Sequence, residues 1–595
     1  MYQYQAPIED MMFLLRDVFD AEEHWAALRG DEAPTLEDAE AIFDQMGSIA
    51  SEVLHPVSGT GDAEGGCTWE NGDVRTPKGY DAAWQALTEG GWVGLSGSAE
   101  FGGMEMPKSL ACFAEEMQWA VNPALRLYGA ATSGAALCIE DHGPEELKQL
   151  YLPRMMTGQW TGTMALTEPQ AGTDLGQLRT KAVPQDDGSY EITGGKIYTS
   201  GGEHDLAENI VHLVLARLPD APAGTRGISL FLTPKFLADG EDGLGARNAV
   251  HCDGIEHKMG IRGSATCTMR FDGATGYMVG QPHRGLQAMF TMMNYERIAV
   301  GLQGLGAGEL GYQYAAAHAS ERRQGRALDG AVDPDAPADT LLVHPDVRRM
   351  LLTQRAYNEA GRAFVTYLSM QADTAKDEGD KNIARKAHQL LSLLTPVSKA
   401  FMSDLGFEGC VAAQQIFGGA GYVDSSGIEQ IVRDARIAQI YEGANGVIAM
   451  DLLGRRVMPD GGAMVGELLD EIESFCDGTS DDPWTKAQVA ALRPAAARMR
   501  KVTRTVVSLA QQPFNGADEI GAAAYPYLQA LGHVAYAYMW ARMTDAVSGK
   551  NTDFAEAKRQ TGRFFITHLL PRFDAACASA EAGAQPIMGL SAEAF

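Results

Sequence analysis

The chain contains few cysteines, and its histidines show no metal-binding spacing. Its 595 residues include eight cysteines, which are scattered so that no two form a CxxC pair. None of the thirteen histidines belongs to an HExxH motif. These absences argue against a zinc or other metal site and against a disulfide framework, and they suit a reducing cytoplasm.

Basic residues are also scarce. Lysine and arginine number 48 against 78 aspartates and glutamates, which gives a formal net charge of −30 at pH 7. So acidic a chain argues against a nucleic-acid-binding surface as a global property, and we expect no nucleic-acid partner. An anionic ligand must then meet a local cluster of basic groups or backbone N–H groups.

No long hydrophobic run opens the chain. The segment MYQYQAPIEDMMFLLRDVFD lacks a basic stretch, and its apolar run from Met11 to Leu15 is shorter than a signal peptide or a membrane span requires. We therefore expect a cytoplasmic protein that has no membrane partner.

The sequence does contain 45% hydrophobic residues, which over this length is enough for several domains. Residues 8–158 carry apolar side chains mostly at helical spacing, and helices are expected around 36–54, 106–119 and 144–158. A loop-rich stretch at 56–79 interrupts them.

The pattern changes at about residue 160. From there to about 280, short alternating segments are separated by turn residues, which is typical of a β-domain. Asp187-Gly188 lies between two such segments and predicts a hairpin. Helical patterns return after Gly285, over residues 285–325, 343–376, 380–425 and 442–457.

Two segments punctuate the second half of the chain. The acidic, proline-bearing stretch 328–341 is interpreted as a surface insertion, and 458–485 as a break before a last helical region at 486–575. The sequence thus predicts an α+β fold that is mostly helical. We expect an N-terminal helical domain, a middle β-domain, a C-terminal helical bundle and an additional helical C-terminal domain, over residues 1–158, 159–281, 282–457 and 458–595.

Gly306-Ala307-Gly308-Glu309-Leu310-Gly311 fits the dinucleotide-binding fingerprint GxGxxG. The residues before it are helix-like, and no βαβ unit surrounds it, so the context that the fingerprint requires is missing. We expect these small residues to serve close helix packing instead.

Several motifs are weak one by one. In MALTEPQAGTD (164–174) a hydroxyl at Thr167 precedes a turn in which a ligand can approach the backbone. In GGKIYTSGG (194–202) Tyr198 and Ser200 offer an aromatic ring beside a hydroxyl, which suits a planar heterocycle. An ordinary turn and a strand end with a core tyrosine explain these two motifs equally well.

Three further motifs lie in the second half of the chain: MNYER (293–297), ERRQGR (321–326) and QQIFGGAGY (414–422). Arginine clusters bind phosphates, but on a helix they are usually solvated or paired. The last motif gives a glycine turn at the end of a helix.

Glu442, in YEGANG (441–446), stands between an apolar run and a glycine-rich turn. It is either an ordinary glutamate at a helix start, where the helix dipole favours it, or a base whose pKa apolar neighbours raise.

Taken in order, TEPQAGTD, GGKIYTS, RRQGR, QIFGGAGY and IYEGANG resemble the acyl-CoA dehydrogenase family over about residues 80–457. The resemblance implies a helical N-terminal domain, a middle β-domain and a C-terminal four-helix bundle, with FAD as the cofactor. The start of the chain, residues 254–286 and the helical region past 460 resemble a longer subgroup, which includes enzymes of dimethylsulfoniopropionate breakdown. That resemblance implies oxidation of 3-methylmercaptopropionyl-CoA to 3-methylthioacryloyl-CoA, with an electron-transfer flavoprotein as the acceptor.

By the same resemblance Glu442 is the base that removes the α-proton of the thioester. Its backbone N–H and a flavin hydroxyl hold the thioester oxygen, and the β-hydride passes to the flavin. Some branches of the family carry the base at the position of Glu296 instead, and this chain has both acids. We favour Glu442 because its whole surrounding motif is kept.

The resemblance also assigns the binding residues. Those expected to contact FAD are Met164, Leu166, Thr167, Tyr198, Ser200, Arg322, Gln415 and Gly419. Those expected near the substrate are Thr173, Asn294, Arg297, Gly443 and Arg455. Arg322, Gln415 and Gly419 are expected to reach the FAD of a neighbouring subunit, which implies a homo-oligomer, with a dimer favoured. Tyr198, Ser200, Thr173, Asn294 and Ala444 depart from the usual family residues tryptophan, threonine, serine, aspartate and threonine.

Other functions stay open at this stage. A general short- or medium-chain acyl-CoA dehydrogenase and an acyl-CoA oxidase would carry the same motifs. A flavin-containing, DNA-associated binding protein is an alternative of another class, although the basic segment 486–504 is better explained as one face of a helix.

Overall fold

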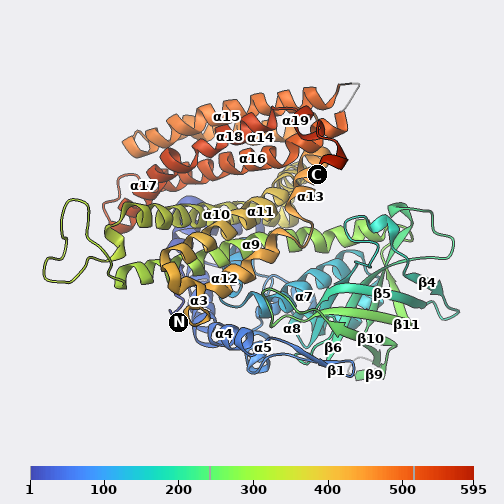
Figure 1. Ribbon diagram of the computed structural model, residues 1–595. Coiled ribbons are helices and arrows are strands. Elements are labelled where there is room, and N and C mark those ends of the chain that lie inside the picture. The colour runs from blue at the N-terminus through green and yellow to red at the C-terminus, as the bar shows by residue number, and fades with distance from the viewer. Residues whose placement is uncertain (1, 240–242, 513–515) are drawn as a thin grey trace. The chain divides into compact units, whose positions relative to one another are not determined.

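The structure is a computed structural model that describes residues 2–239, 243–512 and 516–595 (Figure 1). The chain forms two compact units. The helical unit comprises Met1–Gly47, Pro107–Ala120 and Val300–Phe595, and the β unit comprises Ser48–Met106 and Val121–Ala299.

The β unit is built on a seven-stranded sheet. Its strands are β3 (Trp160–Ala165), β4 (Lys181–Pro184), β5 (Tyr190–Ser200), β6 (Asn209–Arg217), β7 (Ile228–Pro234), β10 (Val250–Ile255) and β11 (Thr266–Val279). Their order is β10-β11-β5-β4-β6-β3, and β7 pairs with both β11 and β6. β3 runs parallel to β6, whereas β5 and β11 are antiparallel. Two further antiparallel strand pairs are β1 (Thr68–Glu70) with β2 (Asp73–Arg75), and β8 (Phe236–Asp239) with β9 (Gly243–Arg247).

The strands β3, β6 and β7 are buried on both faces because they are apolar on both faces, whereas β4, β5, β10 and β11 alternate between buried and more exposed residues. Side chains alternate along a strand, so Val211, Leu213 and Leu215 of β6 share one face and Val214 the other. The first face packs with buried residues of α7 (Pro123–His142), α8 (Glu145–Thr157) and the start of α9 (Gly285–Glu321). α4 (His55–Ala63) and α5 (Tyr80–Glu89) complete the helices that lie wholly in this unit.

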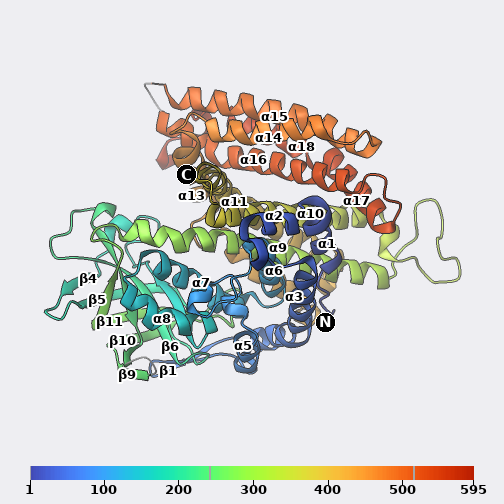
Figure 2. The ribbon, with the colours of Figure 1, turned by 180° about the vertical axis from the view of Figure 1, so that it is seen from behind.

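The helical unit contains the remaining helices. They are α1 (Ile8–Phe13), α2 (Ala21–Arg29), α3 (Leu36–Ile49), α6 (Lys108–Val121), α10 (Pro345–Asp377), α11 (Lys381–Phe417), α12 (Ile428–Ala435), α13 (Asn445–Met450), α14 (Ala463–Gly478), α15 (Pro483–Ala510), α16 (Gly516–Ala546), α17 (Asp553–Phe564), α18 (Pro571–Ala580) and α19 (Gln585–Met588). The helices α14, α15, α16 and α18 lie side by side in both views (Figures 1 and 2). Among the described residues, no helix combines the length and the apolar character that a membrane crossing requires.

The mostly helical α+β fold predicted from the sequence is confirmed, and so is the hairpin at Asp187-Gly188, between β4 and β5. The glycines of the false dinucleotide fingerprint lie within α9. A Cβ at Gly306 would lie 2.6 Å from the backbone nitrogen of Ala120, so close helix packing is confirmed as their role.

Other expectations for local structure were wrong. The stretch 56–79 contains most of α4 and the β1–β2 hairpin, and the break at 458–485 contains α14. The sequence of α4, HPVSGTGDA, is rich in residues that usually mark loops, which hid the helix. α7 was missed because it is buried on almost every side, so no amphipathic pattern marks it.

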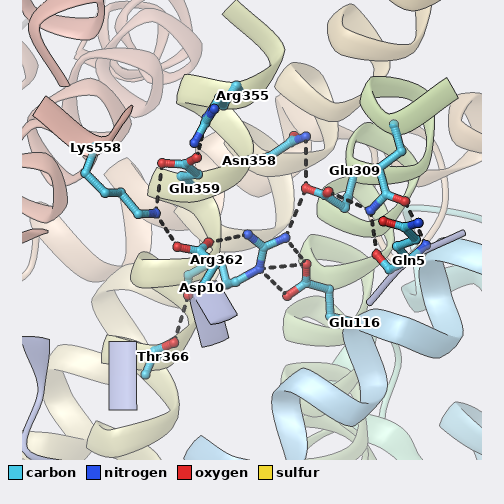
Figure 3. Close-up of polar contacts among 11 residues, drawn as sticks. Gln5, Asp10, Glu116, Glu309, Arg355, Asn358, Glu359, Arg362, Thr366 and Lys558 are labelled. Atoms are coloured by element: carbon cyan, nitrogen blue, oxygen red, sulfur yellow. Dashed lines mark hydrogen bonds and ion pairs between the residues drawn. The ribbon is translucent and has the colours of Figure 1, made fainter. Parts of the chain in front are cut away.

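A buried network of charged side chains centres on Arg362 of α10 (Figure 3). The Arg362 guanidinium pairs with Asp10 of α1 at 2.5 Å, Glu116 of α6 at 2.6 Å and Glu309 of α9 at 3.0 Å. Lys558 of α17 also pairs with Asp10, and with Glu359 of α10. We call these residues the Arg362 network. It ties helices from the two ends of the chain to the middle of the helical unit.

Candidate functional site

The sequence-predicted site residues are divided between the two units. Met164, Leu166, Thr167, Thr173, Tyr198, Ser200, Asn294, Glu296 and Arg297 belong to the β unit. Arg322, Gln415, Gly419, Glu442, Gly443 and Arg455 belong to the helical unit.

In the β unit the chain turns tightly just after β3. The backbones of Glu168 and Ala171 exchange hydrogen bonds of 3.0 and 2.9 Å, with Pro169 and Gln170 at the tip of the turn. Before it, the Thr167 carbonyl accepts a hydrogen bond of 2.9 Å from the N–H of Ile197. Leu166 and Thr167 are therefore held against the last part of β5, and both side chains are half-buried.

Tyr198 projects from a β-bulge in β5. Lys196 is paired with Met269 of β11 and Thr199 with Cys267, so Ile197 and Tyr198 together face one residue of β11. Tyr198 adopts a left-handed backbone with φ of +57°. The residue is 61% exposed. A bulge re-aims the side chains that it carries, which accounts for this exposed side chain near the end of β5.

Met164 and Ser200 flank these features. Met164 is half-buried and is the residue before the last of β3. Ser200 is also half-buried and is the last residue of β5. Thr173 is exposed in the loop that follows the turn. The turn thus has an aromatic ring, half-buried hydroxyls and closely held backbone groups beside it, and this chemistry fits the flavin that the sequence predicts.

The remaining site residues of the β unit lie on the third and fourth turns of α9. Glu296 and Arg297 are buried, at 3% and 5% exposure, whereas Asn294 is half-buried. The approach of α7 is close here, since a Cβ at Gly134 would lie 3.2 Å from Oε1 of Glu296. Glu296 is thus enclosed by helix packing.

In the helical unit Glu442 lies on a strained turn. Its φ is +53° and that of Gly443 is +90°, both in the left-handed region. Helix α13 begins only at Asn445, so Glu442 precedes the helix and does not belong to its first turn. The interpretation of Glu442 as an ordinary first-turn glutamate therefore lacks its structural basis.

The turn is fastened to α11. Lys399 donates 2.7 Å hydrogen bonds to the Gly443 carbonyl and to Oδ1 of Asn445. The Asn445 amide donates in turn to the Ala400 carbonyl at 3.1 Å, to Oγ of Ser403 at 3.0 Å and to Oδ1 of Asp404 at 2.8 Å. A strained conformation persists only where its surroundings over-determine it, and these bonds do so.

Arg322, Gln415 and Gly419 gather at one end of the helical unit. Arg322 directly follows α9, Gln415 lies in the last turn of α11 and Gly419 just after it, and all three are exposed. The ends of the two helices meet, because the rings of His318 and Phe417 stack with centroids 4.2 Å apart. These exposed groups are available to a ligand or to another subunit.

Arg455 lies in the segment Asp451–Val457. Its side chain is 72% exposed and pairs with Asp451 at 3.4 Å.

Sequence reasoning did not single out Lys196, Lys399 or Asn445, which hold the two turns in place. Lys196 lies inside the motif GGKIYTS and Asn445 inside YEGANG. A lysine and an asparagine within otherwise apolar and glycine-rich motifs were the available indication that backbone groups need partners there.

Comparisons with known proteins match the chain from near its start to near its end. Family models match as the acyl-CoA dehydrogenase N-terminal domain (residues 37–159), middle domain (163–274) and C-terminal domain (283–458), and as an acetyl-CoA dehydrogenase C-terminal like domain (468–591).

Curated relatives cover nearly the same length. The 3-methylmercaptopropionyl-CoA dehydrogenase of Ruegeria pomeroyi is 39% identical over 95% of this chain and 96% of its own. A broad-specificity linear acyl-CoA dehydrogenase of Mycobacterium tuberculosis is 34% identical over 88% of each chain. A solved acyl-CoA dehydrogenase of Bacillus anthracis, complexed with FAD, superposes with a TM-score of 0.72 at 20% identity, over 92% of this chain and 90% of that one. At 20% identity this superposition is evidence for the fold alone.

Proposed function

The chain belongs to the acyl-CoA dehydrogenase family, and from that premise we propose that it oxidises 3-methylmercaptopropionyl-CoA to 3-methylthioacryloyl-CoA with Glu442 as the base. Its general function follows from the family: it is an FAD-dependent oxidoreductase that acts on acyl-CoA thioesters. The choice of substrate is supported by the 39% identity with the Ruegeria pomeroyi enzyme, which extends over almost the whole of both chains.

The observation that carries the base assignment is the strained turn at Glu442. The α-proton of a thioester is very weakly acidic, so its removal needs a carboxylate that is positioned before the substrate arrives. The left-handed backbone of Glu442 and Gly443, held by Lys399, provides such a position. We propose that the Glu442 carboxylate takes the α-proton while its own backbone N–H donates to the thioester oxygen, where negative charge develops.

FAD, when bound, supplies the acceptor for the β-hydrogen and its electron pair. We propose that Met164, Leu166, Thr167, Tyr198 and Ser200 hold the isoalloxazine end. Arg322, Gln415 and Gly419, exposed at the ends of α9 and α11, would reach the cofactor of a second copy in a homodimer. Thr173, Asn294, Arg297, Gly443 and Arg455 would contact the acyl-CoA.

Glu296 is the alternative base. Two carboxylates beside one α-carbon do not both ionise cheaply, so one of them must have another role. Glu296 is 3% exposed and enclosed where α7 approaches α9, which suits a structural role. We therefore propose that Glu442 alone takes the proton.

An electron-transfer flavoprotein is the proposed acceptor of the electrons. The test is anaerobic addition of 3-methylmercaptopropionyl-CoA and of linear acyl-CoAs to the purified holoenzyme, followed by the absorbance of its flavin. The proposal predicts the fastest bleaching with 3-methylmercaptopropionyl-CoA, and reoxidation by the flavoprotein faster than by dioxygen. Faster bleaching by a linear acyl-CoA would show that this thioester, and not 3-methylmercaptopropionyl-CoA, is the preferred substrate. Rapid peroxide formation would show that dioxygen, and not the flavoprotein, accepts the electrons.

A further inference from the structure

Lys196 is a fully buried lysine whose charge the proposed reaction does not use. It lies on β5 immediately before the bulge that carries Tyr198, and its side chain is 0% exposed. Its ammonium donates a hydrogen bond of 3.0 Å to the Leu166 carbonyl and one of 2.9 Å to Oε1 of Glu168. The lysine thus reaches from β5 across to both sides of Thr167.

The partner carboxylate is saturated with donors. Oε1 of Glu168 also accepts hydrogen bonds from the Thr180 N–H at 3.0 Å and the Thr180 hydroxyl at 2.6 Å. Oε2 accepts from the Arg179 N–H at 2.7 Å and the Gln170 amide at 2.6 Å. Glu168 therefore fastens the turn after β3 to the start of β4 as well as to β5.

Both members of the pair are ionised near neutral pH. Burial acts to raise the pKa of Glu168, but Lys196 and the Thr180 hydroxyl together lower it to about 2. Burial lowers the pKa of Lys196 to about 8, against the opposing effect of Glu168. A buried ion pair can often be replaced by apolar residues without loss of stability, so stability alone is a poor reason for this one.

The position of the pair gives a better reason. The Ile197 N–H already ties β5 to the Thr167 carbonyl, so the strands would be joined without any charge. The ammonium adds a fixed positive group at the Leu166 carbonyl, within the turn proposed to hold the flavin ring. We propose that Lys196 and Glu168 form a positioning pair that fixes this turn and the Tyr198 bulge, and that the ammonium favours the reduced, more negatively charged flavin. The inference rests on the proposed placement of FAD against the turn.

The test is the reduction potential of the bound flavin in Lys196→Met. We expect a tenfold lower equilibrium constant for two-electron reduction, which is a midpoint about 30 mV more negative. We also expect a lower kcat with an unchanged KM for the thioester. Lys196→Arg keeps the charge and is expected to retain most of the wild-type potential.

Lys196→Met leaves a buried carboxylate without its cation and could fail to fold, so a second variant is needed. Lys196→Met with Glu168→Gln removes both charges and keeps the side-chain sizes. A wild-type potential and a wild-type kcat in this double variant would overturn the inference.

A matched control is Lys558→Met, which removes another buried lysine from its carboxylates in the Arg362 network. It is expected to lower thermal stability and to leave the flavin potential unchanged. An equal shift of the potential in this control would assign the effect to general loosening and contradict the inference. Failure of the proposed function is distinguished from failure of this inference by the wild-type protein. Its flavin would then not be bleached by any thioester, although the reduction potential of that flavin could still be measured.

Discussion

At the scale of single residues, Tyr198 and Glu442 share an unusual backbone. Their φ values of +57° and +53° lie in the left-handed region, where a residue other than glycine is strained by about 1–3 kcal/mol. Neither position is occupied by glycine, which would adopt the conformation without this strain. Positive φ also occurs at Asp20, Asn71, Glu105, Ile261 and His283, so the strain by itself assigns no role. Because Tyr198 and Glu442 lie in the motifs of the family, we infer binding for the first and proton transfer for the second.

Tyr198→Gly separates strain from function. We expect its apoprotein to unfold thermally at the wild-type temperature or above it, because glycine removes the strain. FAD should bind about fivefold more weakly, because loss of an aromatic contact is worth roughly 1 kcal/mol. The measurements are the thermal midpoint and the dissociation constant of FAD. Tyr198→Trp is the control that keeps an aromatic ring, and equal FAD affinity in all three proteins would contradict this role.

Asn445→Ala tests the fastening of the Glu442 turn. The variant loses the hydrogen bonds to Ala400, Ser403 and Asp404, at a stability cost of about 1–3 kcal/mol. Misplacement of the base should lower kcat by about 10–100-fold.

The control is Gln529→Ala, which removes a 2.9 Å hydrogen bond to the same Asp404 from α16. Urea midpoints and steady-state kinetics of both variants distinguish the two effects. A kcat loss of the same size in the control would show that the turn is not held specifically by Asn445.

At the scale of elements, the Arg362 network connects α17 and α1 to α10. Lys558 contributes a buried cation to Asp10 and Glu359, which are themselves buried or nearly so. Helix α17 is thus fastened by charge to α1. A truncation that removed α17 would leave carboxylates inside the helical unit without this counter-charge.

Lys558→Met should lower the free energy of unfolding by about 3–5 kcal/mol, because a buried ion pair that loses one partner leaves an uncompensated charge. The comparison is Lys550→Met, which breaks an exposed pair with Asp17 and should cost less than about 1 kcal/mol. Urea unfolding of both variants measures the difference. Similar small effects would mean that the network adds nothing to the docking of α17.

Elements also show how far the sequence could predict this structure. Alternation predicted the β-domain, and helical spacing predicted α9, α10 and α11. α7 has no polar face and α4 has a loop-like composition, so local pattern could reveal neither helix. The motif residues of the site were assigned by resemblance. The partners Lys196, Lys399 and Asn445 depend on contacts between distant segments, which periodicity does not encode.

At the scale of the whole molecule, buried histidines should make the protein sensitive to acid. Burial lowers the pKa of His204 and His212 to about 3 and that of His533 to about 4. Unfolding restores pKa values near 6.5, so the unfolded chain binds more protons than the folded chain below that pH. The free energy of unfolding therefore decreases as the pH is lowered. At pH 5 each of these histidines should cost about 2 kcal/mol.

Glu116 opposes this trend. Burial raises its pKa to about 7, so between pH 7 and its unfolded value the folded chain binds the extra proton and gains stability as pH falls. The histidines outnumber it, and we expect the thermal midpoint to fall from pH 7 to pH 5. Glu116→Gln should fall more steeply over the same interval. A midpoint that rises toward pH 5 in the wild type would contradict the burial of neutral histidines.

The assignment of Glu442 as the base of a thioester oxidation is tested most directly by anaerobic bleaching of the flavin by 3-methylmercaptopropionyl-CoA in the wild type, Glu442→Gln and Glu296→Gln. We predict that Glu296→Gln bleaches at a rate close to that of the wild type. Glu442→Gln, with its FAD still bound, should be slower by about 10²–10⁴-fold. Rapid bleaching by Glu442→Gln together with loss of bleaching in Glu296→Gln would contradict the claim and move the base to α9.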